Sequence, residues 1–184
     1  MTTEIYLIAP GDADAEALKS ALSASLSSHP VAALLVLRGA RAERDYRDLV
    51  KALLPAAQKA GAAVLVEGEP GLVRLLGADG LHVTGGIGAV KAAIEALKPD
   101  FIVGAGDVRS RDDAMRKAEA GVDYILFGPE TGPLAPAHRD LAQWWSETME
   151  VPGVLSDPEA TPDSFDAGSS EFIGLPLIVR EVAT

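Results

Sequence analysis

Residues 120–130 read AGVDYILFGPE. Gly121 is a typical helix-ending residue, the apolar run Val122–Phe127 has the length of a strand, and Gly128-Pro129 is a turn pair where that strand stops. The same order, a Gly or Pro, then an Asp or Ala, then a short apolar run, recurs in three other segments, which are Ala60–Val66, Gly77–Val83 and Lys98–Gly104. The stretch is therefore one copy of a repeat.

The spacing of the repeat indicates what each copy contains. Asp79, Asp100 and Asp123 follow one another at intervals of 21 and 23 residues. That is about the length of one strand plus one helix, so the pattern predicts repeated β/α units around a parallel sheet.

Composition limits the function classes that such a repeat can serve. With 184 residues, 48 % of them hydrophobic, the chain is expected to form one domain over residues 1–184 with a sizeable core. A net charge of −11 argues against binding to nucleic acid or to an anionic membrane. The sequence has no cysteine, and an acid stands near the N-terminus where a signal peptide needs basic residues, so we expect a cytoplasmic protein. These features are compatible with a homo-oligomer.

Continuous apolar runs are typical of parallel strands that are covered on both faces. The predicted strands are Glu4–Ala9, Val31–Leu37, Ala62–Val66, Asp79–Val83, Phe101–Val103, Val122–Phe127, Gly153–Leu155, and either Glu171–Gly174 or Leu177–Val179. Predicted helices lie between them, the last being one or two turns at Asp163–Ala167. The order predicts a compact (β/α)8 TIM barrel whose terminal helix is shortened or missing, with an open doubly wound sheet as the alternative.

Three segments carry a resemblance to a known family. They read GADGLHVTGG at residues 77–86, GAGDVRS at residues 104–110 and AGVDYILFGPETGPLAP at residues 120–136. Together with the order of the elements, they resemble the thiamine phosphate synthase and TenI family of small TIM barrels, from Glu4 to about Val179. The resemblance implies a transferase of thiamine biosynthesis, which joins a pyrimidine diphosphate to a thiazole phosphate with magnesium and releases pyrophosphate.

Several positions depart from the family pattern. Of the QLRxK run that ends strand two in the family, only Arg38 is present, and the Asn-Asp-Arg run after strand three falls on residues 67–69, which are Glu-Gly-Glu. A magnesium-binding Asp falls on Ile87. Magnesium is thus implied by the resemblance alone, its ligands are not retained, and we predict no metal-ligating residue.

The phosphate-binding positions of the family also differ. Its backbone amides after strands seven and eight fall on Ser156-Asp157-Pro158 and Pro176-Leu177-Ile178, and the lysine after strand six has no counterpart in Thr131–Pro136. Proline lacks an N–H donor, and Asp157 repels an anion. A small phosphate ligand is still the partner that the resemblance implies.

Candidate site residues are the polar residues at predicted strand ends, where barrel enzymes keep their active sites. His82 and Arg109 are the catalytic candidates. The ligand-binding candidates are Arg38, Glu67, Glu69, Asp107, Gly128 and Glu130. Each also has a structural interpretation, since His82 can be a hydrogen-bonded core residue and the acids can be ordinary solvated charges in an acidic chain.

Three functions fit these residues. The first is a diverged family member in or near thiamine metabolism that lacks full synthase activity, that is, a pseudoenzyme of the family. The second is an active synthase, or another enzyme with a phosphate ligand, that uses Arg38, His82 and Arg109. The third is a non-catalytic structural or regulatory subunit.

Overall fold

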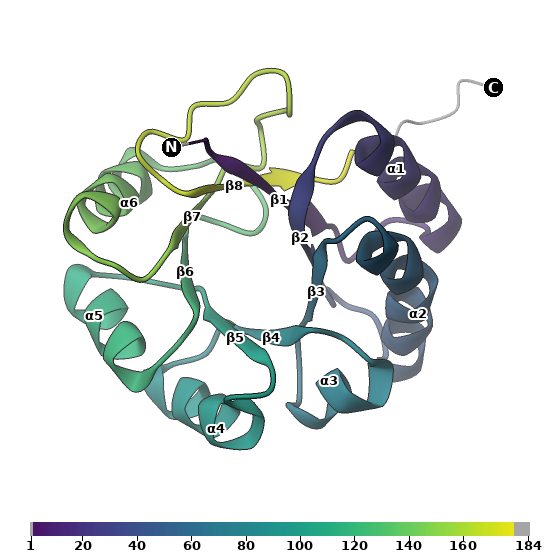
Figure 1. The fold of residues 1–184 in the computed structure, drawn as a ribbon, viewed down its shortest axis with the longest axis horizontal. Helices are drawn as coiled ribbons and strands as arrows, with labels where there is room; N and C mark the ends of the chain where they lie inside the picture. The colour runs from purple at the N-terminus through teal and green to yellow at the C-terminus, as the bar shows by residue number, and fades with distance from the viewer. Residues whose placement is uncertain (1, 179–184) are drawn as a thin grey trace.

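The computed structural model describes residues 2–178 and contains a closed barrel of eight parallel strands, which neighbour one another in sequence order from β1 to β8. Figure 1 looks into this barrel and shows helices α1 to α6 arranged around it. The strands are β1 Glu4–Ala9, β2 Val31–Val36, β3 Ala63–Val66, β4 Gly80–Val83, β5 Ile102–Ala105, β6 Tyr124–Phe127, β7 Gly153–Ser156 and β8 Phe172–Pro176. The helices are α1 Ala15–Ser28, α2 Glu43–Lys59, α3 Gly71–Leu76, α4 Ile87–Leu97, α5 Arg111–Ala120 and α6 Pro136–Thr148.

The predicted TIM barrel is thus confirmed, and the open sheet is wrong, because β1 pairs with β8 and closes the ring. Of the two candidates for the eighth strand, the first is the observed one. The AGVDYILFGPE stretch forms the predicted strand, β6, except that the strand begins at Tyr124 and not at Val122.

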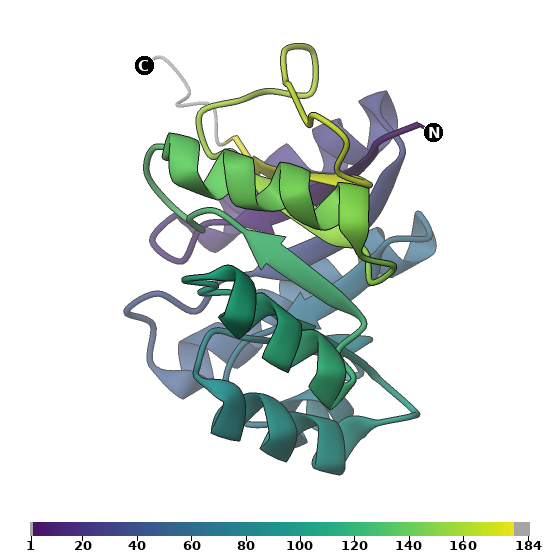
Figure 2. The same ribbon diagram turned by 90° about the vertical axis from the view of Figure 1, so that its left-hand side faces the viewer.

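The predicted short helix at Asp163–Ala167 is wrong. The connection from β7 to β8 has no helix, and Thr161 and Ser164 instead pair across a tight turn through their backbones. Pro162 lies inside this turn, and Gly168 adopts a left-handed backbone soon after it, so the segment offers no run of residues that continues a helix. Figure 2 shows this connection as an irregular loop beside α6. The expected shortening of the last helix concerns residues after β8, of which those from 179 on lie outside the described residues.

Side chains alternate between the two faces of the barrel wall, as closed barrels require. One set packs between strands and helices and includes Leu34, Val64 and Phe127, while the other fills the lumen. The buried lumen residues are Tyr6, Ile8, Ala33, Leu35, Leu37, Leu65, Tyr124, Leu126 and Val154. The lumen is therefore a packed core, and any ligand must bind at its mouth. Within residues 2–178 no helix is long and apolar enough to cross a lipid bilayer.

Two of the repeated aspartates have a structural task at the amino end of the strands. A carboxylate oxygen of Asp79 accepts the amide of Val64 at 2.7 Å, and one of Asp123 accepts the amide of Val103 at 2.8 Å. Each aspartate so ties the start of its own strand to the preceding strand. This gives Asp79 and Asp123 a structural role, whereas Asp100 makes an exposed ion pair with Arg74 at 4.0 Å.

Candidate functional site

A chain of buried polar side chains crosses the lumen. The hydroxyls of Tyr6 on β1 and Tyr124 on β6 lie 2.7 Å apart, and the Tyr124 hydroxyl lies 2.7 Å from Nδ1 of His82 on β4. The His82 and Tyr124 rings are stacked, with centroids 5.7 Å apart. Three strands that are distant in the sequence thus supply one hydrogen-bonded unit.

Two glycines, Gly104 in β5 and Gly106 just after it, leave room for the rings of Tyr124 and His82. A Cβ atom on Gly104 would lie 1.9 Å from the Tyr124 ring, and one on Gly106 would lie 2.7 Å from Nε2 of His82. Real Cβ contacts of this kind do not occur, so the glycines are required by packing.

Glu130 reaches the same histidine from the turn after β6. Its Oε1 lies 3.5 Å from Nε2 of His82, whose side chain is 0 % exposed, whereas that of Glu130 is 28 % exposed. Ser156 holds this turn in place by donating its hydroxyl to the carbonyl of Pro129 at 2.6 Å. Gly128 has φ +96°, and its Cα lies so close to the carbonyl of Ser156 that a Cβ would be 2.6 Å from the oxygen. The predicted role of Gly128 in ligand binding is untested, and its observed role is to shape the turn.

Glu67 stands at the end of β3 and completes the group. Its Oε2 accepts the backbone N–H of Arg38 at 3.0 Å, and its own backbone N–H donates to the hydroxyl of Tyr46 at 2.9 Å. Its carboxyl group lies near enough to that of Glu130 for the charge of Glu130 to act on it. Glu67, Glu130 and His82 are therefore adjacent at the mouth of the barrel, and we call these three residues the mouth cluster.

The two carboxyl groups of the mouth cluster have opposite pKa shifts. Burial, and then the charge of Glu130, raise the pKa of Glu67 to about 7. Burial alone would also raise the pKa of Glu130, but its interactions with His82 and with the Glu67 carboxyl outweigh this and lower it. The pair thus holds one proton between two carboxyl groups below about pH 7, and the pKa values belong to the pair. Burial also raises the pKa of Tyr6 and Tyr124, which stay neutral donors.

Other predicted site residues lie apart from the mouth cluster. The Arg109 side chain is 82 % exposed, and it pairs with Asp107 at 3.3 Å, which is itself on the surface. Glu69 is also exposed. Arg38 contributes its backbone N–H to Glu67, while its guanidinium Nε donates to the carbonyl of Arg41 at 3.2 Å. Of the two catalytic candidates, the structure therefore brings only His82 into the buried cluster.

The residues around Glu67 do not fit the magnesium ion that the resemblance implies. Within residues 2–178, no three His, Asp or Glu side chains are grouped so that they could hold a metal ion. One oxygen of Glu67 already accepts the backbone N–H of Arg38 at 3.0 Å, which leaves less of this carboxyl group for a metal ion. Ile87, at the position of the family's second ligand, begins α4 with an apolar side chain.

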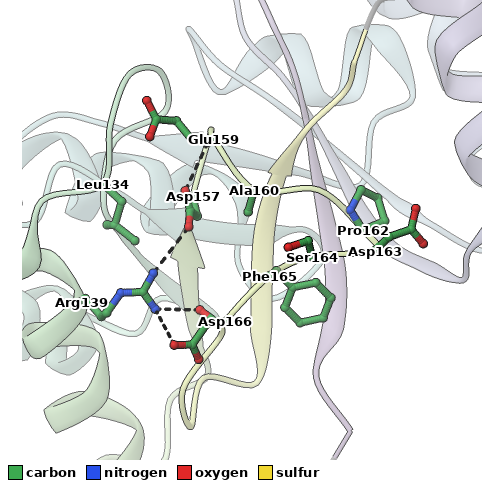
Figure 3. Close-up of a pocket in the computed structure, with 10 residues that line it drawn as sticks. All are labelled: Leu134, Arg139, Asp157, Glu159, Ala160, Pro162, Asp163, Ser164, Phe165 and Asp166. Atoms are coloured by element: carbon green, nitrogen blue, oxygen red, sulfur yellow. Dashed lines mark hydrogen bonds and ion pairs between the residues drawn. The ribbon is translucent and has the colours of Figure 1, made fainter.

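A cavity of about 580 Å³ lies beside the loop between β7 and β8. Figure 3 shows Arg139 of α6 reaching into it from one side. Its guanidinium lies 3.5 Å from a carboxylate oxygen of Asp157 and 3.5 Å from one of Asp166, and it donates to the Asp166 carbonyl at 2.7 Å. Glu159 and Asp163 also line the cavity. Four acids against one arginine make this region unfavourable for a phosphate.

Sequence reasoning missed three buried polar residues of this end of the barrel. Tyr6 and Tyr124 sit at lumen positions of their strands, and counting alternate residues from a strand end would have placed them on the same face as His82. Lys117 is 1 % exposed and donates Nζ to the carbonyls of Gly106 and Asp107, at 3.1 and 3.3 Å. Only its place on the buried stripe of α5 could have indicated this role.

Similarity to known proteins agrees with the fold. The family model described as thiamine monophosphate synthase matches residues 5–155. The thiamine-phosphate synthase of Hyphomonas neptunium is 37 % identical over 162 residues, which cover 83 % of this chain and 73 % of that protein. That of Rhodospirillum centenum is 35 % identical over 156 residues, covering 82 % and 75 %.

Among solved structures, the thiamine phosphate pyrophosphorylase of Pyrococcus furiosus has the same fold, with a TM-score of 0.75 and 18 % identity over 94 % of this chain and 85 % of that one. The YdjI aldolase of Escherichia coli has a TM-score of 0.67 at 17 % identity, over 95 % and 74 %, so this fold serves more than one chemistry. The match of the family model over most of the chain and the identity to two synthases show that this chain belongs to the thiamine phosphate synthase family.

Proposed function

We propose that this protein acts in or near thiamine metabolism as a diverged member of its family that does not carry out the full synthase reaction. The observation that carries the proposal is the acidic mouth of the barrel, where Glu67 and Glu130 lie next to His82. A departing diphosphate needs cations and N–H donors, because negative charge accumulates on its oxygens. Two carboxyl groups at this point oppose that charge.

The cations near the mouth are already engaged by protein groups. Arg109 pairs with Asp107, and Arg139 pairs with Asp157 and Asp166. Lys117 is buried against two carbonyls and Asp113. Arg38 is half-buried, and its Nε donates to a backbone carbonyl. Binding of a diphosphate would require several of these contacts to break.

A synthase assay tests the proposal. The purified protein is incubated with the pyrimidine diphosphate, the thiazole phosphate and magnesium, and thiamine phosphate is measured by mass spectrometry beside the Hyphomonas neptunium relative as a positive control. We expect product at less than about a thousandth of the control rate, which corresponds to about 4 kcal/mol of lost transition-state stabilisation. A rate within tenfold of the control would make the proposal wrong.

Two alternatives make different predictions in related measurements. An active enzyme that uses Arg38, His82 and Arg109 together needs Arg109 at the site, so Arg109→Ala would abolish turnover. A purely structural subunit would show no rise in melting temperature with either substrate, with their products or with other small molecules, because only a ligand that prefers the native state stabilises it. The mouth cluster favours a ligand-binding protein over this second alternative, since a barrel that serves only as a scaffold has no need of two neighbouring half-buried carboxyl groups.

A further inference from the structure

Two buried polar atoms of the mouth cluster face each other without a hydrogen-bond partner. They are Nε2 of His82 and Oε1 of Glu130, which lie 3.5 Å apart. Most buried polar atoms in proteins are hydrogen-bonded, and an exception needs an explanation. Glu130 and Glu67 are half-buried, whereas the His82 side chain is fully buried, so an external group reaches the cluster from the side of the two glutamates.

The groups around this point define what such an external group must be. The Tyr124 hydroxyl on β6 is hydrogen-bonded to Nδ1 of His82, and the Tyr6 hydroxyl on β1 is hydrogen-bonded to the Tyr124 hydroxyl. On the β3 side, the amide of Arg38 donates to Oε2 of Glu67, whereas the Tyr46 hydroxyl accepts the backbone N–H of Glu67 and does not bond to its carboxyl group. Among the described residues, the Arg38 amide is the donor to a carboxyl oxygen of the cluster, and Nε2 of His82 faces Oε1 of Glu130. The remaining carboxyl oxygens of Glu67 and Glu130 are acceptor sites for a donor from outside.

We propose that Glu67 and Glu130, backed by His82, bind a small monocation that donates N–H bonds, such as an amidinium. An amidinium presents two parallel N–H donors, which match the oxygens of carboxyl groups, and its positive charge offsets the repulsion between the two carboxylates once the proton has left the pair. The inference rests on the proposed function in that it names the ligand class of the same site. It also explains why an anion is disfavoured there.

Protonation of the pair is linked to this binding. Below about pH 7 the pair holds a proton, because the pKa of Glu67 is raised to about 7. Between the ordinary carboxyl pKa and that value, the folded protein binds a proton that the unfolded chain has released, so stability falls as the pH rises through this window. A bound cation replaces the proton and removes the repulsion. Its affinity therefore rises with pH.

Benzamidine is a suitable probe, because it is an amidinium at neutral pH and benzamide is its uncharged analogue. Isothermal titration of the full-length protein at pH 6 and pH 8 is expected to give binding of benzamidine that is about tenfold tighter at pH 8, the factor set by displacement of one proton from a group with a pKa near 7. Titrations in two buffers of different ionisation enthalpy should show that up to one proton is released per cation bound. Benzamide and inorganic pyrophosphate should bind at least tenfold more weakly.

Substitutions of the two glutamates test whether benzamidine binds at the mouth cluster. Glu130→Gln and Glu67→Gln should each weaken binding of benzamidine at pH 8 by tenfold or more, and they should remove proton release. Glu119→Gln takes the same charge from the exposed surface of α5, so it is the matched control and should bind as the wild type does. Circular dichroism and urea unfolding of each variant establish that it is folded before it is titrated.

Several results would overturn the inference. They are affinity that is independent of pH, equal binding of benzamide, tighter binding of pyrophosphate, or the same loss in Glu119→Gln as in Glu130→Gln. The proposed function is judged separately by the synthase assay. Absence of cation binding together with absence of synthase activity would remove the ligand class and leave the loss of the synthase reaction standing.

Discussion

Polar side chains are buried and hydrogen-bonded in the lumen of the barrel, whereas in the loop between β7 and β8 they form ion pairs that are partly exposed to solvent. In the lumen, Tyr6, Tyr124 and His82 are fully buried, and two hydrogen bonds of 2.7 Å join them. In the loop, Arg139 meets Asp157 and Asp166 at 3.5 Å, with side chains that remain partly or largely exposed. One region is a fixed unit inside a packed core, and the other is a set of solvated ion pairs.

The two regions differ because burial makes an unpaired polar group costly, whereas solvent weakens an exposed ion pair. A buried polar group costs free energy unless it is hydrogen-bonded, so each member of the lumen chain constrains the next. An exposed ion pair contributes little, so the loop is free to carry charges that suit or exclude a ligand. The lumen therefore holds His82 of the mouth cluster in place, while the loop gathers four acids and Arg139 beside the barrel.

The largest expected effect comes from filling the space beside the lumen chain. Gly104→Ala would place a Cβ 1.9 Å from the Tyr124 ring, which is tied at its hydroxyl to Tyr6 and His82 and cannot move freely. We expect a loss of at least about 3 kcal/mol in the free energy of unfolding, measured with urea. Gly88→Ala is the control, because no atom lies within 4 Å of its new Cβ and stability should be unchanged or slightly higher. Equal effects of the two substitutions would show that the lumen is not tightly packed.

Removing the central hydroxyl of the chain should have the next largest effect. Tyr124→Phe leaves both Tyr6 and Nδ1 of His82 without a partner in the core, for a loss of about 2 to 3 kcal/mol. Tyr6→Phe removes only the end of the chain and should cost about 1 kcal/mol in the same urea titration. If Tyr6→Phe cost as much as Tyr124→Phe, the three groups would not form a chain with Tyr124 at its centre.

The smallest effect is expected in the loop. Arg139→Gln removes both ion pairs, but because these are partly exposed the free energy of unfolding should fall by less than about 1 kcal/mol. The change should instead appear locally, as faster amide hydrogen exchange between Asp157 and Gly168, since Arg139 also donates to the Asp166 carbonyl. A loss as large as that of Tyr124→Phe would remove the contrast between the two regions.

Much of the fold could be predicted from the sequence, because each repeat carries its own local signals. The side chains of Ser110 and Asp14 accept backbone N–H groups at the starts of α5 and α1, which is the helix-start chemistry that these residue types favour. The loop after β7 could not be predicted in this way. Its few residues that could form a helix lie between Pro162 and Gly168, and the backbone pairing of Thr161 with Ser164 replaces the helix.

The candidate site was predictable residue by residue but not as an assembly. His82, Glu67 and Glu130 were identified because they lie at or near strand ends, and the structure brings them together. Arg109 satisfied the same rule, yet its side chain points to solvent beside Asp107, since a position just before a helix does not fix the direction of a long side chain. Distance along the chain gives no information on which strand ends meet across a closed barrel.

The repeated β/α units, the parallel sheet and the family resemblance could be predicted from the sequence, because periodicity, caps and turn residues are local to each unit, whereas the choice of a closed barrel over an open sheet needed the pairing of β1 with β8. Only the tertiary structure decided which groups meet in the lumen and in what protonation state. The AGVDYILFGPE stretch illustrates both kinds of information. Its apolar strand and Gly-Pro turn could be predicted from the sequence, whereas the contacts of Tyr124 and Glu130 with His82 form only when the barrel closes. Burial and the approach of a second carboxyl group, which set the pKa of Glu67, are likewise properties of the closed barrel.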